Sequence, residues 1–176
     1  MKKWNWDALY TSFESKEFQD ALVTLDKEIE EGIAFATKEF NDTSDALRKI
    51  KEYLLASEKL RTLFSRTYAF CSLTISTDAL NEDARKYLNK MSMLSTKTTY
   101  ASTLFSKWLP KVNNLSELIE QDHLLKESEF YLTRIVEGSK YLLSDKEEMI
   151  ISKMKQTSST SWSAMQGELT STLKVD

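Results

Sequence analysis

The sequence predicts an all-α protein, an antiparallel bundle of about six or seven helices. The chain has 176 residues but only three glycines and one proline, whereas average usage of these two residues would give about 20. Sheet and barrel folds need glycine and proline in their turns, so this deficit favours a few long helices. Apolar residues also recur every three or four positions, the spacing of a helix that buries one face. No repeat or linker-like stretch divides the chain, so we expect a single helical domain over residues 1–176.

The first two helices are predicted from two apolar stripes that a polar break separates. The first stripe contains Phe18, Leu22, Leu25, Ile29, Ile33, Ala36 and Phe40. The break is residues 41–44, in which Thr43 or Ser44 is expected to cap the next helix. The second stripe contains Leu47, Ile50, Leu54, Leu60, Phe64, Tyr68, Cys71 and Ile75, and it is interrupted at residues 76–78.

The third long helix is expected to begin after Asn81, a favourable N-cap residue. Its stripe contains Ala84, Leu88, Met91, Leu94, Thr98, Ala101, Phe105 and Trp108. Pro110 should end it, because proline lacks the backbone N–H and clashes with the preceding turn. Two shorter helices are predicted next, over Ser116–Gln121 and Leu124–Val136, and Gly138 is expected to serve as a left-handed C-cap.

The remaining helices are predicted from a cap motif and two short apolar patterns. Ser144 and Glu147 have the spacing of a capping box, and Met149, Ile150 and Met154 follow on the apolar side. The hydroxyl-rich run Thr157–Ser161 predicts a turn. A last helix, with Trp162, Met165, Leu169 and Leu173 on its apolar side, is expected to run to the end of the chain.

Charge and composition exclude several classes of partner. The net charge is −3 at pH 7, and a nucleic-acid-binding surface would need a surplus of lysine and arginine. The longest unbroken apolar runs are four residues, for example 33–36, whereas a membrane-spanning helix needs about 20. We therefore expect neither a nucleic-acid nor a membrane partner. The single cysteine allows no intramolecular disulfide, so we expect a cytoplasmic protein.

Few residues are candidates for catalysis or metal binding. His123 and Glu127 are four apart and could form a two-ligand pair, but a catalytic zinc usually takes three protein ligands, so we expect an exposed pair without metal. Cys71 lies on the second apolar stripe, where a buried, unreactive thiol is expected rather than a nucleophile. Gly32, Gly138 and Gly167 lie too far apart for a phosphate-binding loop. We therefore assign no catalytic, cofactor-binding or metal-binding residue in this chain.

Two further groups of residues are interpreted as structural. Arg48, Lys49 and Lys51 form a small basic cluster next to Glu52, and a solvated helix face is the expected role. The aromatic residues Trp4, Trp6, Tyr10, Phe13 and Phe18 gather near the N-terminus. They could form a binding patch, but anchoring of the leading segment in the core is the favoured interpretation.

Four segments in order carry a family resemblance. They are Trp6–Tyr10 followed by Phe13 and Phe18, then Tyr68 with residues 76–78 and Asn81, then Tyr141–Glu148, and finally Thr160–Thr170. The first is similar to a W-D-x-L-Y opening, the third to H-x-L-S-x-x-E-E and the fourth to S-x-W-x-x-L-x-x-E-L-T. Together they resemble the N-terminal domain of oligoendopeptidase F, a zinc metallopeptidase of the thimet-oligopeptidase-related group. Tyr141 stands where that family often has histidine, and Met165 stands where it often has leucine.

The resemblance implies that this chain is one part of a longer enzyme. Members of the family are cytoplasmic zinc endopeptidases that cut short peptides, and a C-terminal catalytic domain holds the zinc with a His-Glu-x-x-His helix and a later glutamate. None of these zinc or catalytic positions has a counterpart here, and the chain ends about where the N-terminal domain ends. The expected role is a substrate-channel domain, not catalytic alone, whose partners are its own catalytic domain and short peptides. The alternative is a free-standing helical adaptor that binds a partner helix.

Overall fold

The computed structural model describes residues 4–173, and within them all regular structure is helical. The α-helices are α1 (Lys16–Glu39), α2 (Ala46–Thr77), α3 (Glu82–Trp108), α4 (Leu115–Gln121), α5 (His123–Glu127), α6 (Glu129–Ser139), α7 (Asp145–Lys155) and α8 (Ser161–Thr172). A 3₁₀ turn, Leu109–Lys111, follows α3, and a π-helical stretch, Gln156–Thr160, joins α7 to α8. With α7 and α8 counted as one continuous rod, the described part has seven helices. The prediction of an all-α bundle of six or seven helices is confirmed.

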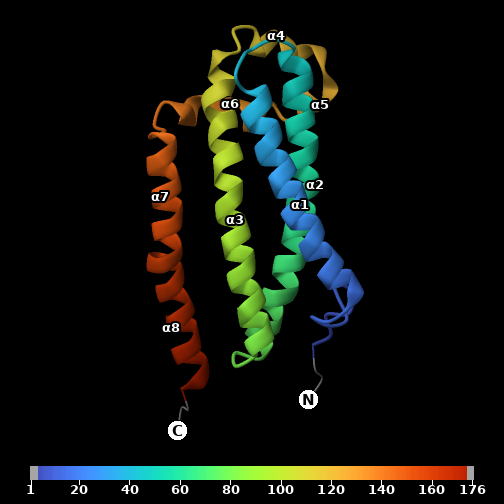
Figure 1. The fold of residues 1–176 in the computed structure, drawn as a ribbon, viewed down its shortest axis with the longest axis vertical. Coiled ribbons are helices and arrows are strands. Elements are labelled where there is room, and N and C mark those ends of the chain that lie inside the picture. The colour runs from blue at the N-terminus through green and yellow to red at the C-terminus, as the bar shows by residue number, and fades with distance from the viewer. Residues whose placement is uncertain (1–3, 174–176) are drawn as a thin grey trace.

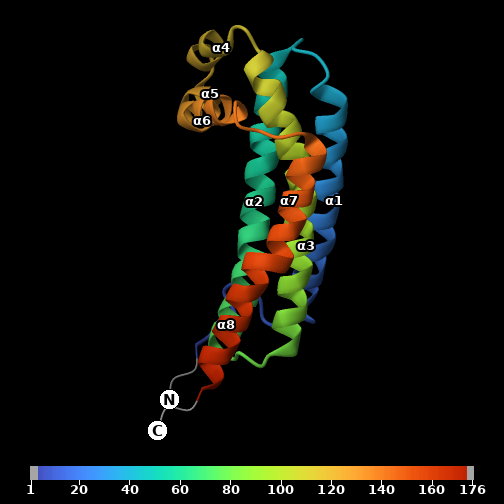
Figure 2. The ribbon, with the colours of Figure 1, turned by 90° about the vertical axis from the view of Figure 1, so that its left-hand side faces the viewer.

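Three long helices form the body of the molecule. In Figure 1, α1, α2 and α3 run side by side with alternating directions, and α7 lies along the outer side of α3. Figure 2 shows that the three short helices α4, α5 and α6 gather at one end of the bundle, to one side of it. Among the described residues, no helix combines the length and the apolar character needed to cross a membrane.

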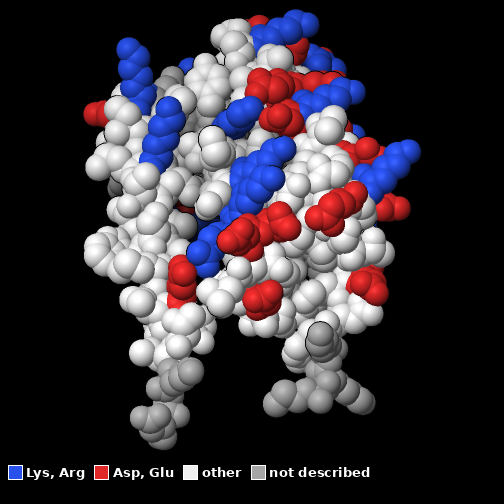
Figure 3. All heavy atoms as spheres, turned by 60° about the horizontal axis from the view of Figure 1, so that its bottom comes forward, with Lys and Arg blue, Asp and Glu red and all other residues white. Residues whose placement is uncertain are grey.

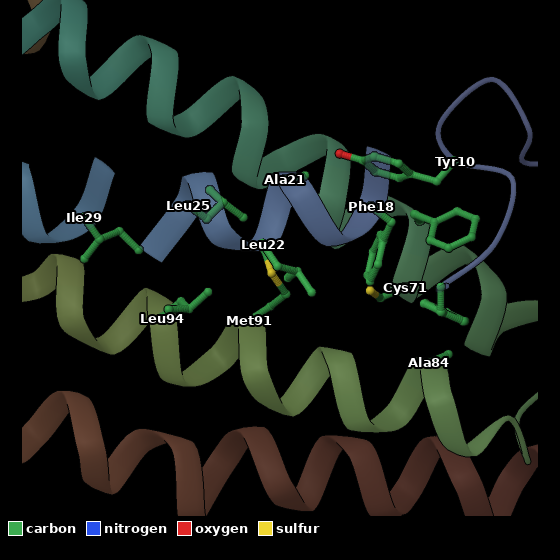
Figure 4. Packing of buried hydrophobic residues seen from close by; sticks show 12 residues of the cluster. Tyr10, Phe18, Ala21, Leu22, Leu25, Ile29, Cys71, Ala84, Met91 and Leu94 are labelled. Carbon is green, nitrogen blue, oxygen red and sulfur yellow. The ribbon is translucent and has the colours of Figure 1, made fainter. Parts of the chain in front are cut away.

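The buried apolar residues form two clusters along the bundle. The first joins the N-terminal segment to α1, α2 and α3, and it includes Phe18, Leu22 and Met91. Figure 4 shows these side chains pointing between the helices. The second cluster joins the other end of the three long helices to α4–α6, and its largest members are Phe105 and Trp108. The three predicted stripes are thus the faces that meet, although Tyr68 of the second stripe is exposed.

Several helix ends follow the predicted capping chemistry. The Asn81 side chain accepts a hydrogen bond from the Ala84 N–H (2.9 Å), as an N-cap does. α3 ends at Trp108, two residues before Pro110. The predicted capping box is present at the start of α7, where the Ser144 hydroxyl accepts from the Glu147 N–H and the Glu147 carboxylate accepts from the Ser144 N–H. These predictions are confirmed.

The predicted cap of the second helix is wrong. Neither Thr43 nor Ser44 is the N-cap of α2, because Asp45 takes that position with a left-handed backbone (φ 50°). The N–H and hydroxyl of Ser44 instead donate hydrogen bonds to the Asp42 carboxylate. A local turn built by Asp42 therefore competes with capping and moves the start of the helix on by one residue.

Three predictions in the C-terminal half also need correction. The helix expected over Leu124–Val136 is divided into α5 and α6 at Ser128. Gly138 lies inside α6, and no described glycine has a positive φ, so it is not a left-handed C-cap. The run Thr157–Ser161 is not a turn, because it continues the α7–α8 rod through the π-helical stretch. The last helix ends at Thr172, and residues 174–176 lie outside the described part.

Candidate functional site

The three cations of the basic cluster on α2 all form ion pairs, and one of them is buried. Lys49 is only 3% exposed, which contradicts the prediction for this residue. Its ammonium group donates to the Asp42 carboxylate (2.9 Å) and to the Asp42 carbonyl oxygen (3.2 Å). Hydrogen bonds from Ser44 and from Lys49 lower the pKa of the Asp42 carboxyl to about 2. The cluster therefore ties the loop after α1 back onto α2.

The other two cations of the cluster are also paired. The Arg48 guanidinium contacts the carboxylates of Glu39 (2.8 Å), Asp45 (2.5 Å) and Glu52 (2.9 Å). Lys51 pairs with Asp122, the N-cap residue of α5, at 2.5 Å. These contacts join α2 to α1 and to the short helices at the end of the bundle.

The N-terminal aromatic residues divide into a buried group and an exposed pair. Tyr10, Phe13 and Phe18 are buried in the first core cluster, as predicted. Trp6 packs against that cluster, whereas Trp4 is 76% exposed and stacks on Trp6 with ring centroids 5.7 Å apart. The prediction of core anchoring is therefore wrong for Trp4 alone.

The candidate metal pair and the single thiol lie in separate places. His123 and Glu127 are both exposed on α5, with the imidazole Nδ1 3.5 Å from a carboxylate oxygen. In the part of the chain that the structure describes, no three histidine, cysteine, aspartate or glutamate side chains come together in a way that could hold a metal ion. Cys71 is completely buried, and this burial raises the pKa of its thiol to about 11. The thiol is protonated at neutral pH and is a core residue.

The α7–α8 rod carries the largest group of exposed apolar side chains among the described residues. α7 packs along α3, but every described residue from Thr157 to Leu173 is exposed. An ion pair between Arg85 and Glu168 (3.3 Å) links α8 to the start of α3. The exposed apolar side chains of the rod are Ile150, Ile151, Met154, Trp162, Met165, Leu169 and Leu173. We call this group the rod surface.

The rod surface has the character of an interaction site. Trp162, Met165 and Leu169 are spaced three and four apart, so they lie on one side of α8. Glu168 is the one charged residue within α8, and the lower left of Figure 3 shows a surface with few charged side chains there. Large exposed apolar groups in a soluble protein mark places where another surface binds. The sequence predicted the apolar side of this helix but not that it would lie in solvent.

A groove of about 470 Å³ opens among α1, α2, α3 and α6, away from the rod surface. Most of the surface that lines it is apolar, and Ile29, Phe35, Leu60 and Phe64 contribute to it. Gly32 of α1 contributes to the space, because a Cβ atom placed on it would meet no other heavy atom within 4 Å. This groove was not predicted from the sequence. The feature that could have indicated it is Gly32 inside a long amphipathic helix, opposite the small residues of 56–57 and 101–102.

Tyr131 of α6 and Arg61 of α2 are among the polar residues that line the groove. Tyr53 lies between the groove and the second core cluster, stacked on Phe105 with ring centroids 3.9 Å apart. Burial raises the pKa of the Tyr131 hydroxyl, and the positive charge of Arg61 opposes that rise. The guanidinium and the phenol therefore belong to the same small region.

Comparison with known proteins gives one match. Residues 112–174 match the family model for the N-terminal part of oligopeptidase F. The match confirms the predicted resemblance. This chain resembles the N-terminal domain of an oligoendopeptidase F-like peptidase. Searches of curated proteins and of solved structures found no match.

The matched residues include two of the four predicted motif segments. Tyr141–Glu148 builds the start of α7, where Ser144 and Glu147 form the capping box. Beside it, the Leu143 N–H donates to the Glu148 carboxylate (3.0 Å). Thr160–Thr170 builds α8 and supplies most of the apolar residues of that helix. The motif segments at Trp6–Tyr10 and around Tyr68 lie outside the matched residues.

Proposed function

We propose that this chain is the substrate-channel domain of a zinc-dependent oligopeptidase that hydrolyses short peptides. The observation that carries the proposal is the oligopeptidase F match over residues 112–174, a segment that contains the exposed rod surface. An N-terminal peptidase domain implies a catalytic partner domain and peptide substrates in general. The whole of residues 1–176 acts as one helical unit in this proposal, in a reducing, cytoplasmic setting that suits its buried thiol.

Catalysis is assigned to the partner domain. A catalytic zinc activates a bound water and polarises the scissile carbonyl, and it usually takes three protein ligands with one position left open. The His123–Glu127 pair offers two ligands on an exposed helical turn. Such a pair leaves most of the metal to water, so zinc held there is weakly bound and easily removed by a chelator.

The rod surface is the proposed contact with the catalytic domain. Its side chains are 45–69% exposed within this chain. Association with a second apolar surface would remove this exposed area from water at about 25 cal/mol per Å². Leu169 is 57% exposed and lies in the last turn of α8. Leu169→Asp should therefore weaken association with little effect on the fold of the chain. Val23→Asp is a matched control, because Val23 is 70% exposed on α1, outside the rod surface.

The test combines binding and activity. The purified chain, alone and joined to or mixed with its catalytic domain, is titrated with zinc and assayed with a quenched fluorescent peptide. We expect turnover only with the catalytic domain present, and we expect Leu169→Asp but not Val23→Asp to reduce association. Chelator-sensitive turnover by the isolated chain, at a rate near that of the complete enzyme, would contradict the proposal. A coding sequence with no metallopeptidase domain would favour the helical adaptor instead.

A further inference from the structure

The groove among α1, α2, α3 and α6 has a shape and a charge pattern that point to a ligand class. Its volume of about 470 Å³ is within the range of small-molecule sites. Ile29, Phe35 and Leu60 line it with apolar surface, and the missing side chain at Gly32 keeps the space open. A ligand that enters must therefore present an apolar group of about the size of one or two amino-acid side chains.

Each carboxylate that lines the groove forms an ion pair with a cation outside it. Glu28 pairs with Lys59 at 2.5 Å, and Glu52 pairs with Arg48 at 2.9 Å. Glu31 pairs with Lys27 at 3.6 Å. None of these three cations lines the groove itself. Cations outside the groove therefore balance part of the negative charge of these three residues.

Arg61 is the one lysine or arginine among the described lining residues. No described carboxylate lies within 4.0 Å of its guanidinium, in contrast to Arg48, which contacts three. A guanidinium can bind a carboxylate through two parallel hydrogen bonds. Tyr131 also lines the groove, close enough for the charge of Arg61 to act on it, and its hydroxyl adds a second donor.

We propose that this groove binds an apolar group that carries a carboxylate, with the apolar part beside Gly32 and the carboxylate on Arg61. Two sources have this chemistry: the C-terminal residue of a peptide with an apolar side chain, and a free apolar carboxylic acid. The site lies within this chain, so the proposal goes beyond the peptidase role and does not depend on it.

The test measures binding to the complete 176-residue chain without any peptidase assay, so its failure would leave the proposed function untouched. The probes are N-acetyl-alanyl-phenylalanine, the same dipeptide as its C-terminal amide, and 4-phenylbutanoate. Calorimetry gives the affinities, and the shift of the Gly32 backbone amide in nuclear magnetic resonance spectra reports the place of binding. We expect the acid dipeptide to bind about fivefold or more tightly than its amide, because only the acid carries a charge for Arg61.

Two variants and two controls make the test specific. Gly32→Leu fills the open space and should weaken binding of every probe by about tenfold or more. Arg61→Gln, at an exposed side chain, should remove the difference between acid and amide. Gly138→Leu and Arg134→Gln are the matched controls, since both residues lie on α6 outside the groove lining and a Cβ at Gly138 also meets open space.

The results distinguish the two ligand sources, and they include outcomes that would overturn the proposal. Tighter binding of the acid dipeptide than of 4-phenylbutanoate assigns the groove to peptide C-termini, and the reverse order assigns it to free acids. Equal affinities for the acid and the amide in the unmodified chain would overturn the proposal, as would the absence of binding at millimolar probe. Unchanged binding by a folded Gly32→Leu variant would also overturn it. If that variant does not fold, the Arg61→Gln comparison decides.

Discussion

A buried pair of hydroxyl groups joins the N-terminal segment to α2. Removal of one hydroxyl should cost more unfolding free energy than removal of the other. Tyr10 Oη lies 3.1 Å from Thr67 Oγ1, and both side chains are buried. The Thr67 hydroxyl donates to the Leu63 carbonyl oxygen at 2.9 Å. Because a hydroxyl has one proton, Tyr10 must be the donor to Thr67. The chain of hydrogen bonds therefore runs from Tyr10 through Thr67 to Leu63.

The two single substitutions leave different groups without a partner. Tyr10→Phe removes the donor while Thr67 keeps its bond to Leu63, so it should cost about 1 kcal/mol of unfolding free energy, the net value of one hydrogen bond. Thr67→Val leaves the buried Tyr10 hydroxyl without an acceptor and should cost about 2 kcal/mol. The double variant has no unpaired polar group, so it should cost about 1 kcal/mol, roughly 2 kcal/mol less than the two single costs together.

Urea unfolding of the four proteins, followed by circular dichroism, measures this cycle. Tyr68→Phe is the control, because Tyr68 is an exposed tyrosine on the same helix, and a change within about 0.5 kcal/mol is expected there. In thermal melts, each kcal/mol should correspond to about 2–4 °C for a chain of this size. A double variant whose cost equals the sum of the single costs would refute the proposed donor order. So would a Thr67→Val variant no less stable than Tyr10→Phe.

Three further predictions concern a cap, a carboxylate and the thiol. Ser144→Ala should cost about 1 kcal/mol of α7 stability by removing the acceptor for the Glu147 N–H, and unchanged amide hydrogen exchange in α7 would contradict this. The Asp42 carboxyl has a folded-state pKa of about 2, below its ordinary 3.8, so its contribution is complete above pH 3.8 and is lost as the pH falls towards 2. The difference in unfolding free energy between the unmodified chain and Asp42→Asn should therefore decrease in acid. Urea midpoints at a series of pH values measure it, and a difference that does not change with pH would contradict this prediction. Cys71 should react with iodoacetamide roughly a hundredfold more slowly in the folded chain than in urea, because burial raises its pKa to about 11. Equal rates would show that the thiol is accessible.

Much of the fold could be predicted from the sequence because local chemistry sets several of the helix ends. The caps at Asn81 and Ser144 act through hydrogen bonds to backbone groups three residues away. Pro110 acts through its own missing N–H. The three long stripes follow from the period of the α-helix, which predicts the buried face whatever lies opposite. The resemblance to oligopeptidase F likewise depended on segments that can be recognised one at a time.

The predictions failed for two physical reasons. In some places the local sequence allows more than one backbone conformation, and in others a contact with another part of the chain decides the structure. Gly138 can adopt a left-handed cap but is equally able to continue α6. Lys49 lies in a basic stretch of the sequence that is typical of a solvated helix face. In the structure its ammonium group is buried, because the Asp42 carboxylate pairs with it.

The candidate sites depended most on the tertiary structure. The apolar pattern of α8 is that of a core helix, and only the packing of α7 on α3 leaves α8 with its side chains in solvent. The groove needs Gly32 of α1, Arg61 of α2 and Tyr131 of α6 at one place, although nearly 100 residues separate the first from the last. The sequence by itself thus determined the helices and the faces that they can bury, because those depend on neighbours within about one turn. Which faces are covered, which remain open and which charges are left unpaired depend on contacts between distant residues, and only the tertiary structure decided them.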